Sequence, residues 1–370
     1  MGTVHDAELY SVGTDEIVAT FRTEGECSVT TVVGEAEVTT SGTYHSARIT
    51  GLEPGVTYPL KVDGADPSEL LPDRVTTLAP LPGRILAKFA TVNDVHFGER
   101  VCGRLGTGEQ MGPLFESAQG AEPYPVVMNR GAIAELAALD ASAILVKGDL
   151  TNAGTVEQYE EFLAAYSALG PTMHHVRGNH DAMVTEQIAS AHAPFAVGIP
   201  GALLAVLDTV RPGTDRGRLS AAQIEWLDTL AAESSDPVLV FGHHHPWNPA
   251  SDDRPDTYFG INPDDSESLC AVIDRREAIA GYFAGHTHRN RVRRFAAARS
   301  VPMVEIACVK DYPGAWAEYH VYDSGYVQIA RRISAHDAMA WTEQTRHMFQ
   351  GMYRDYALGS LDERCFVHSF

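Results

Sequence analysis

The sequence predicts an α/β fold preceded by a small all-β unit, and three observations support this prediction. Residues 3 to about 79 alternate apolar and polar side chains, with no stretch of helical periodicity. From Arg84 onward, short apolar runs that favour strands alternate with segments that favour helices. Several of these runs end at segments rich in histidine and aspartate, as expected where the ends of neighbouring strands form a functional site.

Residues 1–79 are expected to form a small β-sandwich. Alternation at residues 16–21 and 27–33 predicts strands. The predicted turns are at Gly34, Gly42 and Gly64. Residues 51–58, Gly-Leu-Glu-Pro-Gly-Val-Thr-Tyr, resemble the GLxPGxxY corner of fibronectin type III modules, where a tyrosine packs beneath a turn. The resemblance implies a fibronectin III-like domain.

A proline-stiffened linker at residues 78–83 leads into the second predicted domain, residues 84–332. Its first predicted elements are a strand at 85–92, a helix at 131–139 and a strand at 143–147. Two further helices should begin at hydroxyl residues that accept hydrogen bonds from first-turn amides. Thr155 with Gln158 starts a helix through Ala168, and Ser220 with Gln223 starts one through Ala232.

Two long irregular stretches, residues 97–125 and 246–265, are rich in Gly, Pro, Asp and Ser. Because connections of this length are usually functional, we expect them to form walls or lids over a site. Later strands are predicted around Val292, Val304 and Val321, followed by a helical C-terminal tail, residues 333–370. The apolar side chains of this tail need a partner, either the chain's own second domain or another copy in a homo-oligomer.

Composition narrows the classes of function. A chain of 370 residues exceeds the usual size of a single core, which favours two domains. Lys and Arg total 28 against 49 Asp and Glu, a formal net charge of -21 that repels phosphate backbones. We therefore expect no stable complex with nucleic acid. Bound divalent cations would reverse the local sign and admit an anionic substrate.

The cysteines and the apolar runs point to a cytoplasmic protein with no membrane attachment. The five cysteines, an odd and scattered set without a CxxC pair, are expected to be reduced thiols. The first residues lack a basic start followed by an apolar core, and no run approaches the roughly 18 apolar residues that span a bilayer.

Five segments carry the chemistry, each directly after an apolar run. They are Asp94-Val95-His96, Gly148-Asp149, Gly178-Asn179-His180-Asp181, Gly242-His243-His244-His245-Pro246 and Gly285-His286-Thr287-His288. Imidazole and oxygen ligands suit divalent metals, and a shared carboxylate can hold two ions, so Asp149 is the natural bridge of a two-metal hydrolytic site. The glycines that precede the ligands are expected to make sharp turns.

The order of these segments, with Gly-Asn-His-Asp before Gly-His-x-His, resembles the calcineurin-like metallophosphoesterase superfamily over residues 84–332. The resemblance implies a β-sandwich core flanked by helices, in αββα layers. It also implies two divalent ions, which would be Mn, Fe or Zn. The first would be held by Asp94, His96, Asp149 and His288, and the second by Asp149, Asn179, His286 and one histidine of the run 243–245.

The sequence leaves open which histidine of that run would bind the metal. Counting forward from the strand at 238–241 favours His243, whereas counting back from Pro246 favours His244. His245 precedes proline and is expected to support the loop or to touch substrate.

The resemblance implies hydrolysis by attack of a metal-bound hydroxide on phosphorus, with both ions neutralising charge on the phosphoryl oxygens. His180, next to the ligand Asn179, would act as the general acid that protonates the leaving alkoxide. Asp181 would orient the imidazole of His180.

Within the superfamily, purple acid phosphatases also pair a fibronectin-like N-terminal module with this core, but they carry a tyrosine three residues after the bridging aspartate. Here that residue is Asn152, so no tyrosinate ligand to iron is expected. Residues 148–154 and the histidine-proline loop instead resemble bacterial cyclic-nucleotide and glycerophosphodiester phosphodiesterases.

We therefore expect an enzyme that hydrolyses small phosphodiesters, with 3′,5′-cyclic nucleotides ahead of glycerophosphodiesters. A phosphomonoesterase or nuclease acting at the same site is one alternative. A non-catalytic, metal-binding sensor or scaffold is another, although every expected ligand type and the acid are present.

Overall fold

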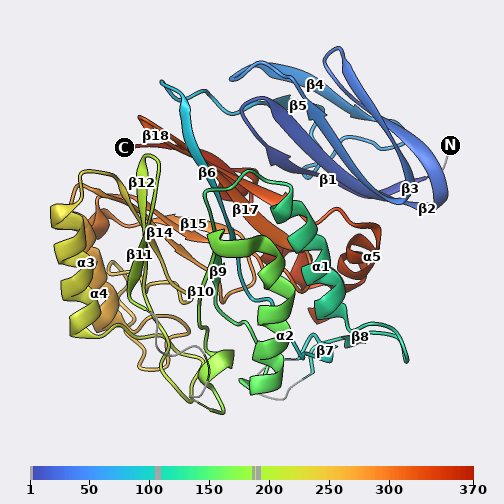
Figure 1. The fold of residues 1–370 in the computed structure, drawn as a ribbon. Coiled ribbons are helices and arrows are strands. Elements are labelled where there is room, and N and C mark those ends of the chain that lie inside the picture. The colour runs from blue at the N-terminus through green and yellow to red at the C-terminus, as the bar shows by residue number, and fades with distance from the viewer. Residues whose placement is uncertain (1–2, 105–109, 186–187, 189–192) are drawn as a thin grey trace.

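Two six-stranded sheets pack face to face between two layers of helices, and the N-terminal strands form a separate five-stranded sheet beside them (Figure 1). The structure is a computed structural model that describes residues 3–104, 110–185, 188 and 193–370. The order helix, sheet, sheet, helix is the αββα arrangement that the family resemblance implied.

The first six-stranded sheet has the strand order β10-β9-β6-β17-β18-β19. Its strands are β6 (Ile85–Val92), β9 (Ala143–Lys147), β10 (Met173–Val176), β17 (Ala315–Tyr322), β18 (Gly325–Arg332) and β19 (Cys365–Ser369). Strands β6, β9 and β10 are parallel, whereas β17, β18 and β19 each run antiparallel to their neighbours. Both strands predicted early in this domain are therefore confirmed.

The second six-stranded sheet has the order β11-β12-β13-β14-β16-β15. Its strands are β11 (Phe195–Ile199), β12 (Ala202–Val206), β13 (Val238–Phe241), β14 (Ile279–Ala284), β15 (Arg291–Arg294) and β16 (Pro302–Glu305). The four central strands are parallel, and the edge strands β11 and β15 are antiparallel. A small hairpin of β7 (Val101–Cys102) and β8 (Phe115–Glu116) lies apart from both sheets.

Helices cover the outer faces of the two sheets (Figure 1). Helices α1 (Tyr124–Ala137) and α2 (Val156–Tyr166) pack on the first sheet, and α3 (Ala221–Glu233) and α4 (Pro263–Arg275) pack on the second. Helix α1 begins earlier than predicted because Pro125 suits the first turn, where its missing amide is not needed. Short 3₁₀ segments lie at Ser167–Thr172, His180–Ala182, Ala296–Ala298 and Phe349–Gly351.

The two predicted helix starts are confirmed in detail. The hydroxyls of Thr155 and Ser220 accept hydrogen bonds from the backbone amides of Gln158 and Gln223. Neither glutamine side chain returns to the capping residue, since the side-chain oxygens accept from Ala153 and Asp208 amides instead. Each glutamine therefore ties its helix to the preceding loop.

Aromatic residues fill the space between the two sheets. Phe89 of β6 stacks on Tyr319 of β17 with ring centroids 4.4 Å apart. It also makes a T-shaped contact with Phe241 of β13, with ring centroids 5.9 Å apart. Phe241 in turn stacks on Phe283 of β14 at 4.9 Å. Close packing of such large rings fixes the spacing of the sheets, and with it the loops at the strand ends.

The N-terminal strands pair antiparallel in a single sheet that encloses its own hydrophobic cluster. They are β1 (Val4–Val12), β2 (Glu16–Val33), β3 (Ala36–Thr50), β4 (Thr57–Val62) and β5 (Arg74–Thr76). At the predicted corner the amide of Glu53 donates to the hydroxyl of Tyr58 at 2.9 Å. The fibronectin III-like sandwich itself stays a prediction. Gly42 lies inside β3 rather than at a turn, which corrects one expectation.

The C-terminal tail contains α5 (His336–Thr345), α6 (Met352–Leu358) and α7 (Leu361–Arg364) before it ends in β19. Trp341, Met348 and Leu358 are buried in the cluster that also holds α1 and α2. The tail therefore docks on its own chain, and a contact between copies stays a prediction. The final strand was not predicted, because residues 365–369 lack the clear alternation of apolar and polar residues that predicts a strand.

All five cysteines carry free thiols, four of them buried. Among the described residues, no helix combines the length and the apolar character needed to cross a membrane.

Candidate metal centre

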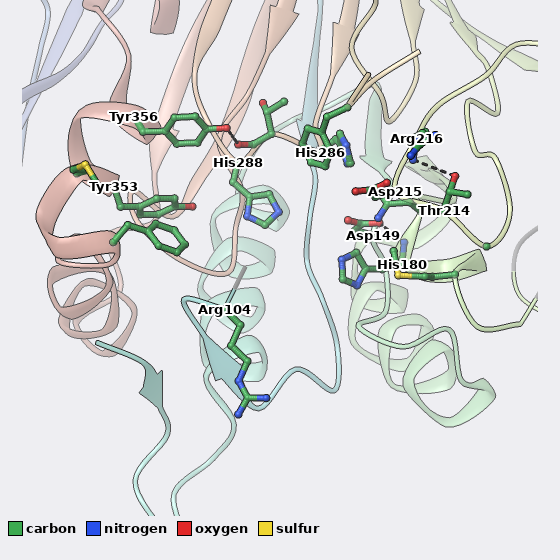
Figure 2. Close-up of a pocket in the computed structure, with 17 residues that line it drawn as sticks. Arg104, Asp149, His180, Thr214, Asp215, Arg216, His286, His288, Tyr353 and Tyr356 are labelled. Atoms are coloured by element: carbon green, nitrogen blue, oxygen red, sulfur yellow. Dashed lines mark hydrogen bonds between the residues drawn. The ribbon is translucent and has the colours of Figure 1, made fainter. Parts of the chain in front are cut away.

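The predicted ligands lie at the carboxyl ends of three parallel strands of the first sheet and two parallel strands of the second. Asp94 and His96 follow β6, Asp149 follows β9 and Asn179 follows β10. The histidine run 243–245 follows β13, and His286 and His288 follow β14. Figure 2 shows Asp149, His180, His286 and His288 pointing into one cavity.

These residues gather in two groups. In the first, one donor atom each from Asp94, His96, Asp149 and His288 lies within 4.8 Å of the others. In the second, one nitrogen each of His243, His244 and His286 lies within 4.8 Å of the others. Sets of three or four nitrogen and oxygen donors at this spacing suit a divalent cation.

Asp149 stands between the two groups. Its Oδ2 lies 3.5 Å from His96 Nε2, and its Oδ1 lies 3.4 Å from His243 Nε2. Asn179 lies on the second side, with Oδ1 3.0 Å from His243 Nε2. One carboxylate thus offers one oxygen to each group, which is the arrangement required of a bridging ligand.

Buried imidazole nitrogens test whether the residues fit cations. His96 Nε2, His244 Nε2 and His286 Nε2 are buried, and none finds a hydrogen-bond partner within the described part of the chain. Buried polar atoms are normally satisfied, and leaving three so close together unsatisfied costs free energy. Cations held by these nitrogens would satisfy them, so the residues present fit two metal ions.

The protonation of three imidazoles and of the bridging carboxylate agrees with that fit. Burial lowers the pKa of His96, His244 and His286 well below the usual range, so each imidazole is neutral, the form that binds metal. Burial opposes ionisation of Asp149, yet the neighbouring imidazoles of His243 and His180 hold the pKa of Asp149 well below its usual range. The bridge is therefore a carboxylate. Burial lowers the pKa of His243, but the charge of Asp149 outweighs it and raises this pKa to about 9, so His243 must lose a proton to bind a cation.

Backbone strain concentrates on the predicted ligands. Ten described residues other than glycine have positive φ, and five of these are predicted ligands. They are Asp94 at 54°, His96 at 47°, Asp149 at 49°, His286 at 69° and His288 at 54°. The left-handed region is unfavourable for such residues and persists only where the surrounding structure enforces it, as it does at functional sites.

The glycines beside the ligands act in two ways. Gly148 has a φ of +90°, the turn that the sequence predicted. Gly178 does not have positive φ, but a Cβ there would lie 2.2 Å from the amide nitrogen and from Oδ1 of Asp149. Close approach of the backbone to the bridge, rather than a turn, therefore requires glycine at 178.

Both candidate histidines of the 243–245 run reach the centre. His243 Nδ1 lies 2.8 Å from the carbonyl oxygen of Lys147, and His244 Nδ1 lies 2.9 Å from Oγ1 of Thr209. Each partner holds Nδ1 and leaves Nε2 facing the centre, as second partners of metal-binding histidines do. The counting arguments offered a choice of one, whereas the structure brings both together.

Thr209 was missed by sequence reasoning. It lies in the loop after β12, and its hydroxyl also accepts from the amides of His243 and His244. A single threonine far from the histidines carries no sequence signal. His245, in turn, is buried against Tyr258, and its carbonyl accepts from the amide of Ile261 at 2.9 Å, so it supports the loop.

The predicted acid, His180, lines the cavity, but the residue that orients it differs from expectation. Its Nδ1 lies 2.7 Å from the backbone carbonyl of Asn152, not from Asp181. Asp181 is fully buried and accepts from the amides of Leu150, Thr151 and Gly178 and from the Thr151 hydroxyl. The carboxylate oxygens of Asp181 already accept hydrogen bonds from these backbone amides. Asp181 therefore holds the Asp149 and Asn179 loops together. The expected role of Asp181 in orienting His180 is wrong.

Asp311 is a second residue that sequence reasoning missed. Its Oδ2 lies 3.8 Å from His288 Nδ1, on the far side of that imidazole from Asp94. Cys308 Sγ and the Tyr353 hydroxyl contact Asp311 Oδ1 at 2.8 and 2.5 Å. Burial raises the pKa of the Cys308 thiol well above its usual range, so this cysteine is a protonated donor.

The centre opens into a cavity of about 1050 Å³. Both long irregular stretches contribute to its wall, through Arg104 and Phe259, as the sequence predicted. Residues 105–109 of the first stretch lie outside the described residues. Loop residues Thr214 and Arg216 form another side (Figure 2). The C-terminal tail adds Phe349, Met352, Tyr353 and Tyr356, which no sequence signal had assigned to the site.

The segments that carry the predicted ligands also match a known protein family. Residues 87–290 match the calcineurin-like phosphoesterase family. The match spans more than half of the 370-residue chain, and the chain belongs to this family.

Two of the relatives are named as phosphodiesterases. The chain is 27% identical over 156 residues to a probable cyclic nucleotide phosphodiesterase of Synechococcus sp., covering 40% of this chain and 57% of that protein. It is 26% identical over 158 residues to a glycerophosphodiester phosphodiesterase of Enterobacter lignolyticus, covering 40% of this chain and 55% of that protein. The chain thus spans little more than half the length of these relatives.

Among solved structures, a dimetal phosphatase from Danio rerio matches with a TM-score of 0.52 and 15% identity. The match covers 68% of this chain and 97% of that one. At such low identity the likeness concerns the fold alone.

Proposed function

We propose that this chain is a binuclear-metal-dependent phosphodiesterase that hydrolyses small phosphodiesters. The observation that carries the proposal is the position of Asp149, whose two carboxylate oxygens face two separate groups of buried donors. The substrates named for the two relatives make 3′,5′-cyclic nucleotides and glycerophosphodiesters the first classes to test.

Two divalent ions, Mn, Fe or Zn, fit these donors. Asp94, His96, Asp149 and His288 would hold one ion, and Asp149, Asn179, His243, His244 and His286 would hold the other. When bound, the ions would neutralise charge on the phosphoryl oxygens and activate water as the nucleophile.

His180 supplies the proton for the leaving oxygen. The carbonyl of Asn152 accepts from Nδ1–H of His180, which orients the imidazole and leaves Nε2 available for proton transfer. His180 borders the cavity beside Asp149, so a leaving oxygen on a phosphoryl group at the centre comes within its reach (Figure 2). Protonation converts a strongly basic alkoxide into a neutral alcohol as the bond to phosphorus breaks.

Bound cations would counteract the negative charge of the whole chain at the cavity. The side chains that line it are balanced, with Arg104 and Arg216 against Asp149 and Asp215, so cations held at the centre would make it positive and attract a phosphoryl group despite the net charge of -21. These local charges favour a small anion that fits inside the cavity over a long polyanion that also meets the acidic surface.

A screen of the metal-free protein reconstituted with Mn, Fe, Zn or no ion tests the proposal. We expect saturable hydrolysis of bis(p-nitrophenyl) phosphate with metal, much weaker hydrolysis of p-nitrophenyl phosphate, and none without metal. Asp149→Ala should lose both bound metal, measured by elemental analysis, and activity. Asp252→Ala, which removes an exposed carboxylate, is the control.

Faster turnover of the monoester would favour a phosphomonoesterase, and turnover of single-stranded oligonucleotides above small diesters would favour a nuclease. Two bound ions without turnover of any phosphoester would favour a sensor or scaffold.

A further inference from the structure

We propose that the C-terminal tail forms a subsite for a flat aromatic ring that is carried by the ester group staying on phosphorus after hydrolysis, such as an aryl group or the base of a nucleoside. This inference rests on the proposed function. It concerns residues outside the segment 87–290 that matches the phosphoesterase family.

The tail builds one wall of the cavity from apolar side chains. Phe349, Met352, Tyr353 and Tyr356 come from the start of α6 and the turn before it. The ring of Tyr353 lies between the rings of Phe349 and Tyr356, with centroids 5.6 and 6.1 Å away. Figure 2 shows Tyr353 and Tyr356 beside His288, across the cavity from His180.

This wall is fastened to the loops that carry the ligands. The Tyr356 hydroxyl donates to the carbonyl of Thr287, the residue between His286 and His288, at 2.8 Å. The amide of Asn290, just beyond His288, donates to the carbonyl of Ala357 at 3.0 Å. The wall is therefore held in a fixed position relative to the centre, as a preorganised binding surface must be.

The wall also leaves apolar surface open to the cavity. Met352 is 53% exposed and Tyr356 is 44% exposed, and Phe259 is 45% exposed above the imidazole of His286, 4.0 Å between centroids. Large apolar groups gathered at the edge of a polar cavity mark a surface that a ligand covers.

The chemistry of the wall selects the kind of ligand. The Arg289 guanidinium lies over the Tyr356 ring with 5.2 Å to the centroid, and the ring of Tyr353 lies beside it, so Tyr356 is held rigidly while its exposed part lines the cavity. Rigid aromatic faces favour stacking of a flat ring, whereas an alkyl chain gains little from this geometry. A cavity of about 1050 Å³ has room for a group of nucleoside size beside the phosphoryl group.

The position of His180 decides which substituent lies on the wall. A leaving oxygen must approach the acid, and His180 lies across the centre from Tyr353 and Tyr356 (Figure 2). The substituent on the tail side is therefore the one that remains on phosphorus.

Two diesters with the same leaving group test this assignment on the metal-loaded protein. Bis(p-nitrophenyl) phosphate keeps an aryl group after hydrolysis, whereas methyl p-nitrophenyl phosphate keeps a methyl group. We expect Tyr356→Ala and Met352→Ala to raise KM for the aryl diester about tenfold, and to change kcat/KM for the methyl diester less than about twofold.

Two control variants separate stacking from other effects. Tyr356→Phe keeps the ring and removes the hydrogen bond to Thr287, so it should retain most of the preference for the aryl diester. Phe370→Ala removes an exposed aromatic residue that is not part of this cavity and should leave both substrates unaffected. Metal content per chain should equal that of the parent protein in every variant.

Equal losses on both diesters in Tyr356→Ala would overturn the subsite while leaving the proposed function intact. A parent protein that prefers a dodecyl over an aryl retained group would overturn the aromatic assignment. Absence of turnover of either diester by the parent protein would overturn the proposed function and this inference with it.

Discussion

At the scale of single residues, the centre depends on backbone conformations that are unfavourable for the residues that adopt them. Five predicted ligands adopt positive φ, and Asp149 among them is held by the amide of His180, which donates to its Oδ1 at 2.9 Å. Strain of this kind fixes the direction of each donor before any ligand arrives. The buried Asp181 supports the same loops, because its carboxylate accepts from the amide of Gly178, whereas the imidazole of His180 bonds to the carbonyl of Asn152.

The role of His180 gives a prediction that depends on the leaving group. His180→Ala should lower kcat for a diester with an alkoxide leaving group, such as a 3′,5′-cyclic nucleotide, by about 10²- to 10⁴-fold. For p-nitrophenolate, which leaves without a proton, the loss should be below about tenfold. Rates on both substrates and metal content of the variant provide the check.

If kcat falls equally for the substrates with the two leaving groups while metal is retained, His180 is not the general acid. Loss of metal would instead make it a structural support of the centre.

At the scale of elements, a buried ionic cluster joins β15 and β16 beside the histidine loop. Glu305 of β16 is 1% exposed and contacts Arg289 and Arg293 at 3.1 and 3.2 Å. Burial would raise the pKa of Glu305, but the charges of His245, Arg293 and Arg289 lower it from 4.5 to about 2. Because the folded state lowers this pKa, the carboxylate stabilises the fold above pH 4.5, and the contribution is lost as pH falls toward 2.

Glu305→Gln should therefore unfold at a lower urea concentration than the parent protein at pH 7. The difference between their urea midpoints should shrink as pH falls from about 4.5 to about 2, because the parent protein then loses the same charge. Glu225→Gln, at an exposed site on α3, is the control and should show no such trend. A difference that stays constant over this range would show that packing, not charge, sets the effect.

At the scale of the whole molecule, buried ion pairs join the N-terminal sheet to the rest of the chain. Glu8 of β1 accepts from the Tyr312 hydroxyl at 2.7 Å, forms an ion pair with Arg346 and lies 3.6 Å from Arg332. The side chains of Glu8 and Arg332 are each 1% exposed. The N-terminal sheet is thereby fixed to β18 and to the tail.

Removing one member of such a network leaves buried charges without a partner. Glu8→Ala should lower the free energy of unfolding by about 3 to 5 kcal/mol. Arg48→Ala removes a pair with Glu16 in which Arg48 is 58% exposed, and it leaves the buried Glu16 paired with Arg331, so it should cost at most about 1 kcal/mol. Urea unfolding of both variants gives the comparison, and similar costs would show that the Glu8 network adds little.

The sequence was most informative where local chemistry and strand order coincide. Thr155 and Ser220 cap helices because a hydroxyl followed by a helical run has few alternatives, and the ligands gather because parallel strands bring their carboxyl ends together. The partner of His180 could not be read, because a backbone carbonyl such as that of Asn152 has no sequence signature. Thr209 and the tail wall depend on contacts between segments far apart in the chain.

The strand β19 has a consequence for how this molecule can vary. It pairs with β18, the strand from which the preceding segment departs, so both ends of residues 333–364 are anchored to one place in the first sheet. That segment is an insertion between two paired strands, with its two ends close together. Trp341 and Met348 of this segment are buried in the cluster of the first sheet, and Arg346 pairs with Glu8, so these residues must be kept. Exchange between related proteins is therefore tolerated at the positions that line the cavity, such as Met352 and Tyr356, which are the ones that would carry substrate preference from one chain to another.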